Sequence, residues 1–384
     1  MKACSYCGRD NDDEVVRCRE CGTEFPAPAS AEPAAEPQAP LPAPKFIDVN
    51  RVEGAFDFRD GFSRPDWKRI GKLIQAIEGE EDRREAWREA ALQWLEKLRA
   101  ELGGEYQWSA SRTCALLSPL DRLTAERLLA FSEHAVSAIR TTLREIAWES
   151  FEGLHVILVF SDGDDYYQYI SDYYPDGDNP ASIGIELSQG YPHVALHYET
   201  ELESSQVIIH ELTHHCLTHL PIPLWLNEGV AQRFQKTIGE AYVPSSTTLA
   251  SDAYWTMMTG WKPPLVWDEL VDAHIGFWNP ERIQRFWAGS SFHEPGDSAQ
   301  LSYSLAEILV HLLAEKDGDF LAFLRAAQAD DAGQTAAWDC LGCCLGETVG
   351  TFLGPGDWRP QRKAIKTYWE AGCSEDETSG ASGV

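Results

Sequence analysis

The sequence predicts an α+β fold in which strands and helices lead into a helix with two histidines and a mainly helical C-terminal half. An unbroken apolar run at residues 154–160, rich in β-branched side chains, is typical of a buried strand. Two histidines four residues apart, His210 and His214, follow an apolar stretch of the kind that forms a buried helix. A small cysteine-rich module and a helical segment precede this domain.

The N-terminal module contains two matched knuckles, Cys4-x-x-Cys7 and Cys18-x-x-Cys21, each followed by a glycine. Four thiolates favour tetrahedral zinc, and in so short a segment the metal supplies most of the folding free energy. A redox dithiol pair or disulfides would use the same cysteines, but two matched knuckles with almost no apolar core favour the metal. Residues 1–25 are therefore predicted to form a zinc ribbon with one structural Zn²⁺, and its acidic loop favours a protein partner.

The segments around the main domain differ in composition. Residues 26–45 are dense in proline and alanine, which predicts an extended polyproline-II linker. Residues 46–104 have helical periodicity after a start signal at residues 63–66, and their tryptophans are expected to pack in a core rather than line a groove. The polar tail at residues 373–384 is predicted to be disordered.

The main domain is predicted at residues 105–372, and its elements alternate before the histidine-bearing helix. They are a strand at 106–117, a helix at 124–147, a strand at 154–160, a short helix before residue 174, and a hairpin at 182–187 and 193–198. His193 and His197 alternate along the last strand, so we expect them at a surface or cleft edge. Residues 288–300 predict a flexible loop, which a helix follows.

The strongest motif is His210-Glu211-x-x-His214. Residues four apart on a helix share one face, so both imidazoles reach one ion, and Glu211 projects beside it. A tetrahedral site with one open position needs a third protein ligand, which Glu228 can supply from a following helix. The prolines in residues 221–223 end the first helix, because proline lacks the amide donor and restricts the residue before it.

At these residues, HELTHH followed by WLNEGVA, the chain resembles the gluzincin metallopeptidases, in particular compact bacterial forms related to the aminopeptidase branch. The resemblance implies a zincin-like catalytic domain that hydrolyses peptides or proteins with one catalytic Zn²⁺. It implies His210, His214 and Glu228 as zinc ligands and Glu211 as the general base. It also implies that the last strand edges the cleft and pairs with an extended substrate.

In related peptidases a tyrosine of the C-terminal helical half donates a hydrogen bond to the oxyanion. The resemblance makes Tyr303 the candidate for this role, and it leaves Tyr242 and Tyr254 as alternatives.

Two departures limit what the resemblance implies. The stretch at residues 184–188 contains a glutamate but lacks the spacing and neighbours of the GAMEN motif that captures a free substrate amine, which favours an endopeptidase. Gln232 stands where thermolysin-like enzymes have an aspartate that orients a zinc-bound histidine, so another residue is expected to take that role.

Net charge and composition disfavour some classes of binding partner. A formal net charge of −29, from 32 Lys and Arg against 61 Asp and Glu, disfavours nucleic acid and anionic membranes as partners. The absence of a leader pattern, of a long apolar run and of a secreted disulfide framework predicts a cytoplasmic protein. Cys340, Cys343 and Cys344 are expected to be buried core cysteines. The alternative function is a zinc-ribbon adaptor whose peptidase-like domain binds a protein without cleaving it.

Overall fold

The computed structural model describes residues 2–3, 10–12, 15–17, 19, 47–148, 153–174, 182–242 and 267–366. The chain divides into two compact units, Met1–Pro44 and Lys45–Val384. The four cysteines of the predicted zinc ribbon, the predicted linker and the predicted tail lie outside the described residues.

In the first unit a short antiparallel pair joins β1 (Lys2–Ala3) to β2 (Asp10–Asn11). The Asn11 side chain accepts a hydrogen bond from the Arg19 amide at 3.0 Å, which ties the following turn to β2. The prediction of a metal-bound ribbon remains a prediction.

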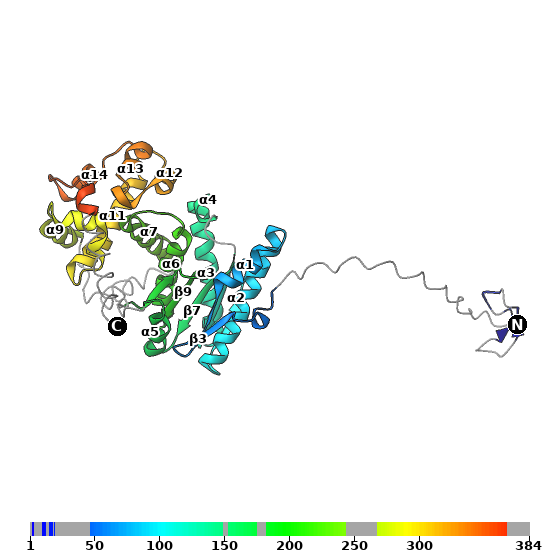
Figure 1. The fold of residues 1–384 in the computed structure, drawn as a ribbon. Coiled ribbons are helices and arrows are strands. Elements are labelled where there is room, and N and C mark those ends of the chain that lie inside the picture. Colours follow the sequence, from blue (N-terminus) through cyan, green and yellow to red (C-terminus); the bar gives the residue numbers. More distant parts are fainter. Residues whose placement is uncertain are drawn as a thin grey trace, which may run out of the picture. The chain divides into compact units, whose positions relative to one another are not determined.

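The second unit is a mixed α+β structure built on a five-stranded sheet (Figure 1). Across the sheet the strands run β5 (Gln107–Ala110), β6 (Cys114–Ser118), β7 (His155–Phe160), β9 (His193–His197) and β8 (Gly184–Leu187). The inner pairs β6–β7 and β7–β9 are parallel, whereas β5 and β8 pair antiparallel at the two edges. Every residue of β7 is buried, which confirms the predicted buried strand.

The strand predicted at residues 106–117 is wrong as a single strand, because the chain turns within it. The Ser111 hydroxyl accepts hydrogen bonds from the amides of Thr113 and Cys114, and the Ser111 amide donates to the Cys114 carbonyl at 2.8 Å. This local hydrogen bonding by serine closes a hairpin and produces β5 and β6.

One face of the sheet is covered by the N-terminal segment and α5. These elements are η1 (Val49–Arg51), β3 (Phe56–Arg59), β4 (Phe62–Pro65), α1 (Trp67–Gln75), α2 (Glu80–Leu102) and α5 (Gly163–Ser171). Trp67 and Trp94 are buried against Tyr191, which confirms the prediction of core packing. The β3–β4 hairpin was not predicted.

His193 is also in this layer, so its expected surface position is wrong. It is fully buried, and its two ring nitrogens contact the Tyr191 carbonyl and the Tyr169 hydroxyl, both at 2.8 Å.

The opposite face packs against helices that include the metal-binding pair. These are α3 (Arg122–Leu143), α4 (Glu145–Trp148), α6 (Glu201–Leu217) and α7 (Leu224–Tyr242). The C-terminal half, yellow to red in Figure 1, adds α9 (Trp267–Phe277), α10 (Arg282–Ala288), η2 (Ser290–Phe292), α11 (Asp297–Ala314), α12 (Phe320–Ala326), η3 (Ala329–Asp331), α13 (Gln334–Leu341) and α14 (Leu345–Leu353).

The loop expected at residues 288–300 is wrong for most of its length. Phe292 is buried in η2 and stacks on Phe286, and α11 begins at Asp297. Cys340, Cys343 and Cys344 are half-buried rather than fully buried. Across the part of the chain that the structure describes, no helix has the length and apolar character needed to cross a membrane.

Candidate metal centre

The helix α6 carries the two histidines and is buried along most of its length. Its N-terminus is capped by Thr200, whose hydroxyl accepts from the Glu203 amide at 3.2 Å and donates to the Glu203 carboxylate at 2.7 Å. From Ser204 to Leu217 every residue except His214 is buried. The cap fixes where the helix begins, and burial on nearly all sides holds His210 and His214 in one orientation.

The edge strand β8 lies directly against α6. A Cβ added at Gly184 would overlap the Val207 side chain, so only glycine allows this close approach. Side chains two apart on a strand share a face, and Glu186 therefore points toward the same helix as Gly184.

The break between α6 and α7 forms where the prolines predict it. The helix α6 ends at Leu217 and α7 begins at Leu224, and the amides of Leu226 and Asn227 donate to the Pro223 carbonyl at 3.0 and 3.1 Å. Trp225 is fully buried, and its indole N–H donates to the Ala332 carbonyl at 3.0 Å. This anchor fixes the start of α7 and thereby the position of Glu228.

The structure brings His210, His214 and Glu228 together, with one donor atom from each lying within 4.8 Å of the others. The two Nε2 atoms are 3.0 Å apart. Glu228 Oε2 lies 3.3 Å from His210 Nε2 and 3.4 Å from His214 Nε2.

The two separations from Glu228 fit a single metal ion, and the separation between the two Nε2 atoms is shorter. Around a tetrahedral ion with bonds of about 2.0–2.1 Å to nitrogen and oxygen, neighbouring donors lie about 3.3–3.4 Å apart. Two imidazoles and one carboxylate supply three donors, which would leave the other positions of a bound ion to water or another ligand. The buried cluster can therefore hold a metal ion.

The charges in the cluster also favour a cation. Burial is the largest single influence on the pKa of His214 and lowers it, but Glu228 and Glu211 together outweigh burial and raise the pKa to about 10. Burial likewise raises the pKa of Glu228, but the two imidazoles outweigh it and hold that pKa well below its usual range. The raised pKa of His214 favours a proton on that imidazole, which a divalent cation would displace.

Polar side chains of α7 lie around the two imidazoles. His210 Nδ1 is 3.1 Å from Gln235 Oε1. The Asn227 side chain lies beside the other histidine and contributes to raising its pKa. Gln232 does not take the orienting role, because its buried amide nitrogen has no hydrogen-bond partner in the structure and His210 is bonded to Gln235 instead.

Glu211 is 7% exposed and lies among acidic and phenolic groups that the sequence did not indicate. Burial, and then Glu211, raise the pKa of Glu186 to about 7, although His214 lowers it. Burial, Glu211 and Glu186 raise the pKa of Tyr174, which follows α5. Glu186 and Tyr174 therefore belong to the same electrostatic environment as Glu211.

The structure describes two of the three tyrosines considered as the oxyanion donor. Tyr303 lies on α11, the helix that packs against α7, and its ring meets the Phe292 ring at 5.0 Å between centroids. Tyr242 is the last residue of α7, and Tyr254 lies outside the described residues. Tyr303 as an oxyanion donor remains a prediction.

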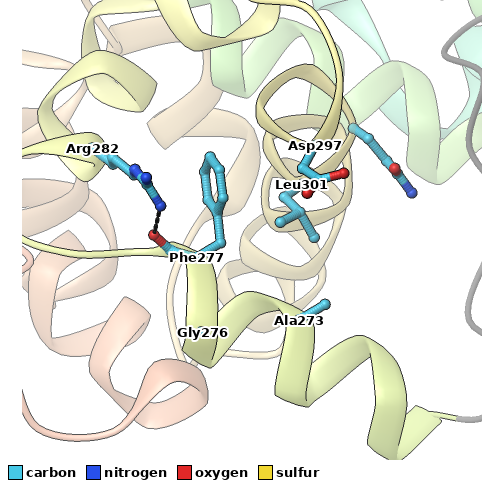
Figure 2. A pocket seen from close by; sticks show the side chains of 7 residues that line it. Ala273, Gly276, Phe277, Arg282, Asp297 and Leu301 are labelled. Atoms are coloured by element: carbon cyan, nitrogen blue, oxygen red, sulfur yellow. Dashed lines mark hydrogen bonds between the residues drawn. The ribbon is translucent and has the colours of Figure 1, made fainter.

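A cavity of about 260 Å³ lies elsewhere in the helical half, between α9, α10 and α11 (Figure 2). It is lined by Ala273, Gly276, Phe277, Arg282, Asp297, Gln300 and Leu301. The Arg282 guanidinium donates to the Phe277 carbonyl at 2.8 Å and lies 4.5 Å from the centre of the Phe277 ring. No residue of the metal cluster lines this cavity, and its one cationic side chain is already engaged in the wall.

No family model, no curated protein and no solved structure matches this chain.

Proposed function

We propose that this chain is a zinc-dependent peptidase of the gluzincin type, with a zincin-like catalytic domain, which cleaves internal peptide bonds. The observation that carries the proposal is the donor set of His210, His214 and Glu228 at tetrahedral spacing, with Glu211 next to the first ligand. When bound, a zinc ion would supply the Lewis acidity that polarises a substrate carbonyl and acidifies water.

Residues of the chain would then supply the acid–base group and the ligands. Glu211 takes a proton from the attacking water and returns it to the leaving amine, as a buried carboxylate beside the ligands can. His210, His214 and Glu228 hold the ion and leave one position for the reacting groups.

The last strand before α6, which the resemblance expects at the cleft edge, is β9, and it lies between β7 and β8. A substrate strand would therefore add to β8 instead. This strand is the last of the described sheet and pairs with β9 along one side, so its other side offers backbone donors and acceptors to an extended peptide. Such pairing recognises the main chain of the substrate rather than its terminus, which supports an endopeptidase. The zinc ribbon would recruit a protein partner.

The test is cleavage of casein and of a mixed-sequence peptide library by the full-length protein, with and without a chelator. The variant Glu211→Gln removes the base but keeps the ligands, and Glu126→Gln, an exposed carboxylate that pairs with Arg122, is the matched control. We expect the Glu211→Gln variant to bind zinc but lose about 10²–10⁴-fold of the activity, whereas the control keeps it.

Two outcomes would contradict the proposal. Cleavage by Glu211→Gln at the wild-type rate would exclude Glu211 as the base. No cleavage of either substrate by the zinc-loaded wild type would favour the adaptor function, in which the same domain binds a protein without cleaving it.

A further inference from the structure

The pairing of α6 with α7 sets side chains of the two helices opposite one another in an antiparallel register. A Cβ added at Gly239 on α7 would overlap the Gln206 side-chain amide of α6, so this glycine marks a close crossing. One turn along each helix from that crossing, in opposite directions, stand His210 and Gln235. The backbone pairing of the helices, rather than a chance side-chain conformation, therefore places these two residues together.

The hydrogen bond between His210 and Gln235 has a defined donor and acceptor. His210 Nδ1 lies 3.1 Å from Gln235 Oε1, and an amide oxygen only accepts hydrogen bonds, so Nδ1 must carry the proton. The other ring nitrogen then keeps its lone pair, and Nε2 is the atom that faces His214 and Glu228. The tautomer that binds a metal is thus the one that Gln235 selects.

Burial strengthens the hydrogen bond between Gln235 and His210. Gln235 is 4% exposed and His210 is 7% exposed, so water does not readily replace the amide oxygen. Glu228, Gln232 and Gln235 share one face of α7 at spacings of four and three residues, and Gln235 is the one that reaches the imidazole.

We propose that Gln235 is the positioning residue of the metal centre, which fixes the ring orientation and tautomer of His210 through a neutral carboxamide. This inference rests on the proposed function only in that the cluster binds a metal ion. A carboxylate at this position would make the imidazole a more electron-rich ligand. A neutral amide at this position would therefore leave a bound ion more electrophilic than a carboxylate would.

The experiment compares three full-length variants by their affinity for Zn²⁺ and Co²⁺, measured in competition with a chelator. Gln235→Met keeps the side-chain volume but removes the acceptor, Gln235→Glu restores an acceptor with charge, and Gln232→Met is the same change one turn earlier. The His214→Ala variant, which lacks a ligand, gives the contribution of other metal sites, including any at the N-terminal cysteines. Absorption of the Co²⁺ forms reports the geometry of coordination.

We expect Gln235→Met to lower the affinity about 10–100-fold, as loss of an outer-shell partner of a metal-bound histidine does. Gln235→Glu should match or exceed the wild-type affinity. Gln232→Met should bind as the wild type does, because its amide nitrogen has no partner to lose.

Equal affinity of Gln235→Met and wild type would overturn the inference, and so would equal losses in Gln235→Met and Gln232→Met. If Gln235→Met fails to fold, weak binding by a folded Gln235→Glu would overturn it as well. The affinity measurements need no catalysis, so absence of peptidase activity would refute the proposed function and leave this inference tested separately.

Discussion

Gly229, the residue after the ligand Glu228, is where α7 touches α11. A Cβ at this position would lie 2.7 Å from Val310 Cγ2 and 2.8 Å from the Ala306 carbonyl carbon. Carbon atoms prefer to be about 3.5–4.0 Å apart, so Gly229→Ala would force the two helices apart by on the order of 1 Å. Most of the obstacle is helix backbone, which cannot rotate away as a side chain can.

Two opposing effects set the size of the change in the free energy of unfolding. Overpacking a close contact costs about 1–3 kcal/mol, and the upper end applies here because backbone must move. Alanine in place of glycine within a helix returns about 1 kcal/mol. The expected net effect is a loss of about 2 kcal/mol. The displacement would also move Glu228, so the affinity for zinc should fall.

The assay is urea unfolding of the metal-free protein, followed by zinc competition on the folded variant. Gly276→Ala is the matched control, because Gly276 also lies in a helix and an added Cβ there meets no atom within 4 Å. We expect this control to be neutral or stabilised by up to about 1 kcal/mol. A Gly229→Ala protein as stable as the wild type, with unchanged zinc affinity, would refute the proposed contact between α7 and α11.

Two further predictions concern protons. Burial lowers the pKa of His193 and His274 to about 4. Between about pH 6.5 and 4 the unfolded chain therefore binds more protons than the folded state, and stability falls as the pH falls. The expected loss at pH 5 is about 2 kcal/mol per histidine. Urea midpoints at pH 7 and pH 5 check this, and His193→Gln should weaken the pH dependence; an equal dependence in the variant would contradict it. Zinc binding at pH 7–8 should release a proton, because Glu228 raises the pKa of His214 beyond the lowering by burial, to about 10. The pH change in weak buffer measures this release, and zinc uptake at the cluster without any release would show that the imidazoles are neutral beforehand.

Several features were predictable because their causes are local. The two histidines share a face because of helix periodicity, and the prolines at 221 and 223 end one helix and allow the next. Spacing therefore paired His210 with His214, whereas the choice of Glu228 as their partner also used the resemblance of WLNEGVA to the gluzincins. The strand β7 was evident from its apolar run, and the coarse α+β class was confirmed. The hairpin β3–β4 was missed, although the alternation Phe56-Asp57-Phe58-Arg59 and the Asp60-Gly61 turn are local hairpin signals.

Other features depended on which surfaces meet. His193 has the alternation of an exposed strand residue, yet it is buried because α1, α2 and α5 cover that face of the sheet. Glu186 resembles an ordinary polar strand residue, and only the approach of β8 to α6 at Gly184 brings it beside Glu211.

The sequence by itself therefore determined the donor set and the helices that present it, because helix periodicity and proline act within a few residues of the chain. Only the tertiary structure decided what surrounds the donors. The partner of His210 is Gln235, 25 residues away on another helix, rather than Gln232 at the position that the motif suggests. The choice between these two glutamines depends on the register of α6 against α7, which packing sets and spacing along the chain does not encode.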